Sequence, residues 1–238
     1  MVKYTVFAKK CIIRIDMTRI EKSEIDIKEE NIKTLHDDKF LNLYLMEYER
    51  NPHYLLASRR QKDKLVALKS EDEYKSMLPD AVTCVVIVET PGSEPRLYLE
   101  REFRYPVKHF LLSPPAGLID PCDGKDGQDP RIVAAKREIR EETGITVRDS
   151  DEIYIANPLV FSSPGMTDES NSMVCAKVKL KDLSSLTTDL AEGTECFGDY
   201  LLVTKDEAKE ILRSGRDEKG LYYSVFTWAA LLYFVYEC

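Results

Sequence analysis

The sequence is poor in the residue types that build zinc sites. Its three histidines, His36, His53 and His109, stand far apart, and its six cysteines include no C-x-x-C pair. Structural zinc sites need closely spaced Cys and His ligands, and disulfide frameworks are typical of short secreted chains. We therefore expect neither a zinc site nor a disulfide scaffold. Reduced thiols and a cytoplasmic location are expected instead.

Long apolar runs and an excess of positive charge are also missing. The most apolar stretch, SVFTWAALLYFV, is shorter than the about 20 residues that cross a bilayer, and it predicts a buried helix. The N-terminal segment MVKYTVFAKKCIIRIDM lacks the continuous apolar core of a secretory signal. The net charge of -8 argues against sequence-independent binding to nucleic acid. We expect neither a membrane nor a nucleic acid as partner, and an anionic ligand would need local cations or bound metal.

Clear secondary-structure signals begin near residue 80. The run AVTCVVIVE has the β-branched composition of a buried strand, and PRLYLEREF alternates with period two. The intervening TPGSEP is turn-forming, so these segments predict a β-hairpin. Two further strands are predicted downstream, EIYIANPLVF and SMVCAKVKL.

A helix is predicted between two end signals that flank residues 130–143. Asp129 can serve as the N-cap, Pro130 suits the first turn, and Gly144 suits a left-handed C-cap. A second helix opens on a capping box that starts at Thr204, and a third begins near residue 224. Because strands and helices alternate, the fold class is predicted to be α/β, with a mixed sheet.

The first part of the chain has a different character. Residues 1–76 are charge-rich and carry short apolar alternations, KCIIRID and LNLYLMEYE, which predict strands. This region has too few apolar residues to be expected to stand alone. We therefore predict an N-terminal β-rich region over residues 1–76 and a main domain over residues 77–238.

The stretch REIREETG, residues 137–144, crowds carboxylates onto one turn of the predicted helix. Glu138, Glu141 and Glu142 stand at i, i+3 and i+4, so their side chains project from one face. Closely placed carboxylates without His or Cys suit Mg²⁺, or else Mn²⁺. The alternative is an ordinary solvated helix face, which charge runs on helices usually form.

The same stretch resembles the second half of the Nudix box, whose pattern is G-x5-E-x7-R-E-U-x-E-E-x-G-U with U apolar. Every fixed position of that half is matched by residues 137–145. In the first half, Gly117 is followed by Asp123 in place of Glu, and thirteen residues rather than seven then precede Arg137. A six-residue insertion in the loop accounts for this spacing. Counting backwards instead places Asp129 at that acidic position, although capping is its simpler role.

The resemblance extends to the ADP-ribose pyrophosphatase group of Nudix hydrolases. The segments that resemble this group are REFRYPV followed by PPAGLID, the loop SSPGMTDES and the segment YLLASRR. It implies an α/β/α sandwich and Mg²⁺-dependent cleavage of a nucleoside diphosphate linked to X, giving AMP and ribose 5-phosphate from ADP-ribose. It also implies a homodimer in which the N-terminal region of one chain helps to complete the other's site.

The resemblance implies specific site residues. The metal ligands would be the Ala116 carbonyl, Glu138, Glu141 and Glu142. The catalytic set would be Glu141, Glu142, Arg137 and Glu169, with Glu169 as general base. The substrate-binding set would be Tyr54 and Arg59 at the adenosine part, Arg104 at the diphosphate, and Met166 in the pocket lining.

Each of these residues also has a structural alternative. Arg104 could pair with a surface acid, Tyr54 could belong to a core or an interface, and Met166 could pack locally. Glu169 could lie on a solvated loop, and Ala116 could simply be a small residue in a tight turn.

At two positions the sequence departs from the pattern of ADP-ribose pyrophosphatases, and both positions bear on the identity of the substrate. Ser113 and Leu55 stand where relatives are expected to carry acids, so a nucleotide sugar, or another nucleotide diphosphate such as an oxidised nucleotide, is an alternative to ADP-ribose. The remaining alternative is a Nudix-fold module that senses a nucleotide without cleaving it.

Overall fold

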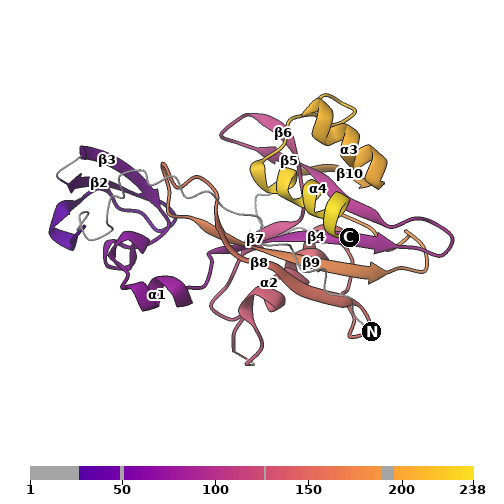
Figure 1. Ribbon diagram of the computed structural model, residues 1–238, viewed down its shortest axis with the longest axis horizontal. Helices are drawn as coiled ribbons and strands as arrows, with labels where there is room; N and C mark the ends of the chain where they lie inside the picture. The colour runs from indigo at the N-terminus through magenta and orange to yellow at the C-terminus, as the bar shows by residue number, and fades with distance from the viewer. Residues whose placement is uncertain (1–26, 49–50, 126, 189–195) are drawn as a thin grey trace, which may run out of the picture.

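The computed structural model describes residues 27–48, 51–125, 127–188 and 196–238, and these form two separate sheets. A three-stranded sheet lies at one end of the molecule, and a seven-stranded sheet with helices on both faces forms the main body (Figure 1). The α/β fold class is thereby confirmed, and the layers are those of an α/β/α sandwich. The predicted strand KCIIRID lies outside the described residues.

The N-terminal sheet is an antiparallel meander, β1 (Ile32–His36), β2 (Asn42–Tyr48) and β3 (Asn51–Ser58), with the order β1-β2-β3. The segment LNLYLMEYE is thus a strand, as predicted. Short helices precede and follow the sheet: η2 (Glu29–Asn31), η3 (Lys62–Lys64), η4 (Val66–Leu68) and α1 (Glu71–Ser76).

This region has a small apolar cluster of its own. The inward face of the sheet buries Ile32, Tyr44, Met46 and Leu56, and Leu65 from the following segment closes the cluster. Alternation along the strands collects these few apolar side chains on one face.

The main sheet has the order β10-β5-β4-β9-β8, with β6 paired to β5 and β7 to β4. Its central strands β4 and β9 run parallel, and the other pairs are antiparallel, so the sheet is mixed as predicted. The strands are β4 (Ala81–Glu89), β5 (Arg96–Arg104), β6 (His109–Ser113), β7 (Ala116–Leu118), β8 (Glu152–Phe161), β9 (Ser170–Lys179) and β10 (Phe197–Val203).

The β4–β5 hairpin exists, but its strands pair over only two positions, Ile87 with Leu97 and Val88 with Arg96. Beyond these positions the strands separate. The first residues of β4 pair with β7 on one side and with β9 on the other. This divergence brings β7 to the start of β4, where the candidate site lies.

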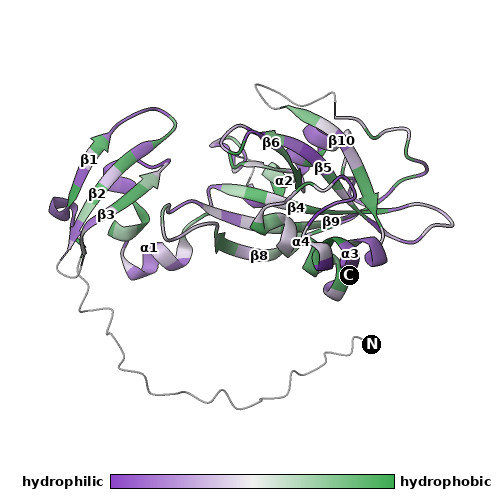
Figure 2. Ribbon diagram, turned by 90° about the horizontal axis from the view of Figure 1, so that it is seen from above, coloured by the Kyte–Doolittle hydropathy of each residue, from purple (hydrophilic) through white to green (hydrophobic). Residues whose placement is uncertain are grey.

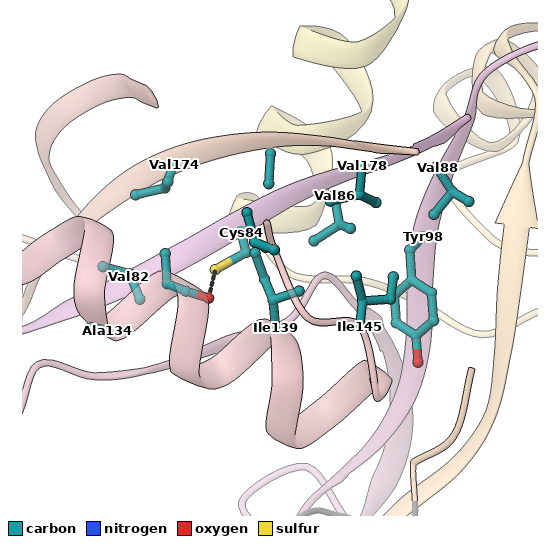
Figure 3. Packing of buried hydrophobic residues seen from close by; sticks show 13 residues of the cluster. Val82, Cys84, Val86, Val88, Tyr98, Ala134, Ile139, Ile145, Val174 and Val178 are labelled. Carbon is teal, nitrogen blue, oxygen red and sulfur yellow. Dashed lines mark hydrogen bonds between the residues drawn. The ribbon is translucent and has the colours of Figure 1, made fainter. Parts of the chain in front are cut away.

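Helix α2 (Pro130–Thr143) covers one face of the main sheet. Side chains of β4 alternate, so Val82, Cys84 and Val86 point toward this helix and meet Ala135 and Ile139 in one apolar cluster (Figure 3). The predicted ends of the helix are present. The Asp129 side chain accepts from the Arg131 N–H, and Gly144 has φ 75°, which favours glycine at a C-cap.

Helices α3 (Lys205–Ser214) and α4 (Val225–Glu237) cover the opposite face and bury a second apolar cluster with β4, β5 and β9 (Figure 2). The Thr204–Glu207 capping box is present. The prediction that the last helix is buried is only partly right. One face buries Leu231 and Phe234, whereas Trp228 is 48% exposed. Among the described residues, no helix is both long and apolar enough to traverse a bilayer.

Candidate active site

The three helix carboxylates do not form a solvated face. Glu138 is 7% exposed and Glu142 is 3% exposed, while Glu141 is partly buried. Both buried acids lie against the backbone of β7. Glu142 Oε2 accepts a hydrogen bond of 2.9 Å from the Ala116 N–H, and the Glu138 carboxylate lies next to Gly117. The alternative of an ordinary exposed helix surface is therefore wrong for these residues.

The environment of Glu142 opposes its ionised form. Burial raises the pKa of this carboxyl well above its usual value, and the nearby Glu100 and Glu138 carboxylates raise it further. The hydrogen bond from Ala116 acts in the other direction without cancelling the effect. Crowded carboxylates with raised pKa values are common where a protein binds a cation or carries out acid–base chemistry.

Arg137 organises the neighbouring acids. Its guanidinium donates to Glu138 at 2.6 Å and to Glu141 at 3.3 Å. It also donates to the Leu118 carbonyl at 2.9 Å and to Asp123 at 3.3 Å. Asp123 is itself buried. Within the described residues, Arg137 therefore holds the orientation of the acids rather than facing a pocket.

The structure gives different contacts to Asp123 and Asp129, the two candidates for the first acidic position of the Nudix-like motif. Asp123 contacts Arg137, whereas Asp129 caps α2 and pairs with Arg131 at 2.6 Å. The insertion in the loop thus leaves Asp123 beside the motif arginine, as the forward spacing from Gly117 predicts.

Gly117 lies unusually close to the Glu138 side chain of helix α2. A Cβ atom placed on Gly117 would come within 1.9 Å of Glu138 Oε1. Such a distance is far below any van der Waals contact, so only glycine admits the Glu138 carboxylate at this place.

A pocket of about 350 Å³ opens on the other side of the β7 backbone. Its walls combine two arginines, an acid and several small or polar residues. They are Arg59, Ala81, Thr83, Arg104, Ser113, Pro114, Ala116, Gly117, Leu118, Glu169, Asn171, Ser224 and Phe226. Arg59, Arg104, Ala116 and Glu169, four residues implied by the resemblance, therefore share one pocket, with Glu138 and Glu142 directly behind its Ala116–Gly117 wall.

Both pocket arginines are paired with acids. Arg59 Nε lies 2.7 Å from Glu169 Oε1, and Arg104 Nη2 lies 2.5 Å from Glu102 Oε2. Each of the two arginine side chains is about half exposed. The alternative role of Arg104, pairing with an acid, is thus realised in this structure while the residue also lines the pocket.

A cluster of three charges joins the N-terminal sheet to the pocket. Arg60, which follows β3, contacts Asp80 at 2.6 Å and Asp168 at 3.3 Å. Ser58 Oγ donates to Asp168 at 2.6 Å, and the Ser170 N–H donates to Asp80 at 2.8 Å. All three charged side chains are largely buried.

This junction, formed by Arg60, Asp80 and Asp168, fixes its chain neighbours. Arg59 precedes Arg60, and Glu169 follows Asp168, so the junction sets the two members of the pocket ion pair opposite each other.

Two implied substrate residues lie elsewhere. Tyr54 lines a separate apolar pocket of about 390 Å³ with Tyr48 and Phe161, and its hydroxyl donates to the Gly165 carbonyl at 2.8 Å. Met166 is 61% exposed and lines neither pocket. Ser113, one of the two positions where an acid was expected, lines the 350 Å³ pocket, while Leu55, the other, is exposed on the outer face of the N-terminal sheet.

The carboxylates do not yet converge as metal ligands. Among the residues that the structure places, no group of three or more His, Cys, Asp or Glu side chains has the spacing of a metal site. Glu138 and Glu141 turn toward Arg137, and Glu142 turns toward Ala116. The hard oxygen donors still suit Mg²⁺.

Sequence reasoning missed Glu100, Arg60, Thr83 and Asn171, all of which lie at the site. Glu100 and Thr83 stand within strand segments, where a buried polar residue in an apolar run was the available signal. Arg60 was not considered, because the resemblance assigned a role only to its neighbour Arg59.

Comparisons with known proteins agree with this geometry. The chain is 30% identical over 141 residues to an ADP-ribose pyrophosphatase of Saccharomyces cerevisiae, covering 57% of each chain. It is 33% identical over 103 residues to an uncharacterized Nudix hydrolase of Schizosaccharomyces pombe, covering 42% of this chain and 44% of the relative. The matches thus span about half the length of these curated relatives. No protein-family model matches the chain.

The fold has a solved counterpart. The crystal structure of an ADP compounds hydrolase superposes with a TM-score of 0.51 and 15% sequence identity. The superposition covers 87% of this chain and 90% of that one. This likeness concerns the fold alone.

Proposed function

We propose that this Nudix ADP-ribose pyrophosphatase-like protein hydrolyses the diphosphate bond of a nucleoside diphosphate linked to X. One arrangement carries the proposal. Glu138 and Glu142 are buried against the Ala116–Gly117 backbone, and the same backbone lines a pocket together with Arg59, Arg104 and Glu169. Acids for a cation, arginines for phosphate and a carboxylate for a proton are the groups that this reaction needs.

Glu138, Glu142 and the Ala116 carbonyl would hold Mg²⁺, with Glu141 as a further ligand or base. The residues fit a hard divalent cation, because the buried Glu142 carboxyl, whose pKa burial and the nearby Glu100 and Glu138 raise, favours a positive partner when it is ionised. When bound, such an ion supplies charge neutralisation at the phosphate oxygens. Arg137 would keep the acids oriented, since it already contacts Glu138 and Glu141.

The pocket arginines would bind the diphosphate. A planar guanidinium forms two hydrogen bonds with phosphate oxygens, so substrate would replace Glu169 at Arg59 and Glu102 at Arg104. The released Glu169 carboxylate could then accept a proton from the attacking water. Water attacks one phosphorus, the bridging P–O bond breaks, and ADP-ribose would yield AMP and ribose 5-phosphate.

A nucleotide sugar is the second candidate substrate, and Ser113 is the observation that favours it. Ser113 lines the pocket where an acid was expected, so the pocket lacks one carboxylate that would discriminate among X groups. A panel of ADP-ribose, other ADP-sugars and UDP-sugars, each incubated with Mg²⁺, tests the proposal by release of the nucleoside monophosphate.

We expect turnover of at least one ADP-linked compound, and its loss when EDTA removes the metal. Tight binding of these compounds without any product would instead favour the nucleotide-sensing module.

The outward face of the N-terminal sheet would support a homodimer. It exposes Leu35, Leu43 and Leu55 to solvent, with Phe40 and Leu41 close by in the chain. Exposed apolar groups of this kind are typical of protein–protein contacts. We expect a dimeric mass by size-exclusion chromatography with light scattering, and a monomeric mass at micromolar concentration would contradict it.

A further inference from the structure

Two buried polar atoms face the active-site pocket without a hydrogen-bond partner. They are Thr83 Oγ1 and Asn171 Oδ1, on side chains that are 1% and 7% exposed. Both residues line the 350 Å³ pocket. A buried polar group that makes no hydrogen bond costs about 1–3 kcal/mol, so folding alone gives no reason for either group.

The strands place the Thr83 and Asn171 side chains on the same face of the main sheet. Thr83 belongs to β4 and Asn171 to β9, which are parallel neighbours with Ala81 opposite Asn171. Alternation along β4 sends Cys84 to the core under α2 and leaves Thr83 on the opposite face. Ala81, which pairs with Asn171 and precedes Thr83 by two residues on β4, is small and lines the same pocket.

The chemistry of the two atoms selects their partner. A carboxamide oxygen only accepts hydrogen bonds, while a hydroxyl donates and accepts. Ionised phosphate oxygens donate nothing, and Arg59 and Arg104 already provide donors for them. Asn171 Oδ1 therefore requires an O–H or N–H group rather than a phosphate.

We propose that Thr83 and Asn171 form a hydroxyl-binding pair that holds an O–H group beside the scissile diphosphate. The inference rests on the proposed function and adds a recognition element to the same site. The O–H group belongs either to a sugar of X or to the attacking water, which would lie between Asn171 and Glu169, both on the pocket wall.

Two substitutions of Thr83 have opposite expected effects on stability and activity. Thr83→Val removes the hydroxyl at nearly constant shape, so it should leave the melting temperature unchanged or raise it by about 2–4 °C. It should also lower kcat/KM about five- to tenfold. Thr83→Ser keeps the hydroxyl and loses a buried methyl, so it should melt lower while keeping kcat/KM within about twofold.

Thr227→Val is the matched control. Thr227 is also buried, but its hydroxyl donates to the Leu112 carbonyl at 2.7 Å. Removing it leaves that carbonyl without its donor, so the control should melt lower. Asn171→Leu should follow Thr83→Val, with unchanged or higher stability and a lower kcat/KM.

A substrate whose X group carries no hydroxyl, the ethyl ester of ADP, separates the two sources of the O–H group. If the Thr83→Val effect disappears with this substrate, the pair binds a hydroxyl of X. If the same fold-loss in kcat persists, the pair positions water. Either result supports the proposal.

The proposal is overturned if Thr83→Val melts as low as Thr227→Val and retains wild-type kcat/KM. Should the wild-type protein cleave no compound of the panel, the proposed function fails by itself. The hydroxyl-binding pair is then decided by the stability changes and by the ADP-ribose-induced rise in melting temperature. That rise should be smaller in Thr83→Val than in Thr83→Ser if the pair binds a hydroxyl of X. Equal rises, together with a Thr83→Val variant that melts as low as Thr227→Val, would overturn the proposal.

Discussion

Glu142→Gln is expected to lower kcat on the order of a thousandfold while the protein remains folded. The substitution keeps the shape of a side chain that is 3% exposed and removes the charge that would hold Mg²⁺. Because Glu142 lies near Glu100 and Glu138, the loss of this charge also relieves repulsion. Product release from the preferred substrate with saturating Mg²⁺ measures the effect.

The same substitution should change how stability depends on pH in metal-free protein. Burial and neighbouring acids raise the pKa of Glu142 in the folded state, so the folded protein binds this proton more tightly than the unfolded chain. Its contribution to stability is complete below the ordinary carboxyl pKa and is lost as pH rises through the folded pKa. Urea unfolding in EDTA should therefore show a smaller fall in stability toward alkaline pH in Glu142→Gln than in wild type.

Glu210→Gln is the control for both measurements. Glu210 lies on α3, and its exposed side chain pairs with Arg213. Neither activity nor the pH dependence of stability should change in this variant. If Glu142→Gln also kept full activity, the assignment of the helix acids to catalysis would be wrong.

Gly117→Ala should reduce kcat at least about a hundredfold with only a modest loss of stability. The added Cβ would come within 1.9 Å of Glu138 Oε1, so the Glu138 carboxylate must move. The carboxylate is the end of a flexible side chain, so the fold can yield there, but the displaced group is a proposed metal ligand. Steady-state kinetics and the Mg²⁺ concentration for half-maximal rate should both report the displacement.

Gly198→Ala serves as the matched control, because an added Cβ there meets its neighbours at 3.4 Å or more. Gly198 lies in β10, away from the pocket. Its substitution should leave kcat unchanged. A Gly117→Ala variant with wild-type kcat and wild-type Mg²⁺ dependence would mean that the position of Glu138 does not matter for turnover.

Local signals in the sequence were sufficient for the catalytic helix. Asp129, Pro130 and Gly144 delimit α2 as predicted, since caps act through neighbouring backbone groups. The close contact between Arg137 and Glu141 was likewise readable from their i, i+4 spacing.

Long-range packing was beyond such local reasoning. Asp80 and Asp168 meet Arg60 from distant parts of the chain, and no spacing rule links those positions. Glu100 sits on the face of β5 toward α2, where a charged residue in a strand is ordinarily read as solvent-facing. The outward direction of Leu55 depends on the register of β3 against β2, which the sequence did not reveal.

The substrate-binding roles of Tyr54 and Met166 stay predictions. Tyr54 reaches the loop that carries Glu169 through its bond to Gly165 rather than through the active-site pocket. An adenine that stacks on Tyr54 would therefore occupy the neighbouring apolar pocket beside Tyr48 and Phe161.

The Arg60 junction bears on how the chain could be divided. A cut near residue 76 falls between the two sheets, yet a fragment starting at residue 77 would keep Asp80 and Asp168 and lose the guanidinium between them. Two largely buried carboxylates would then lie near each other without the cation that pairs with both of them. The segment that follows the N-terminal sheet thus supplies the cation for two acids of the main domain, and we expect truncation at residue 77 to disturb the neighbouring Arg59–Glu169 ion pair even without ligand.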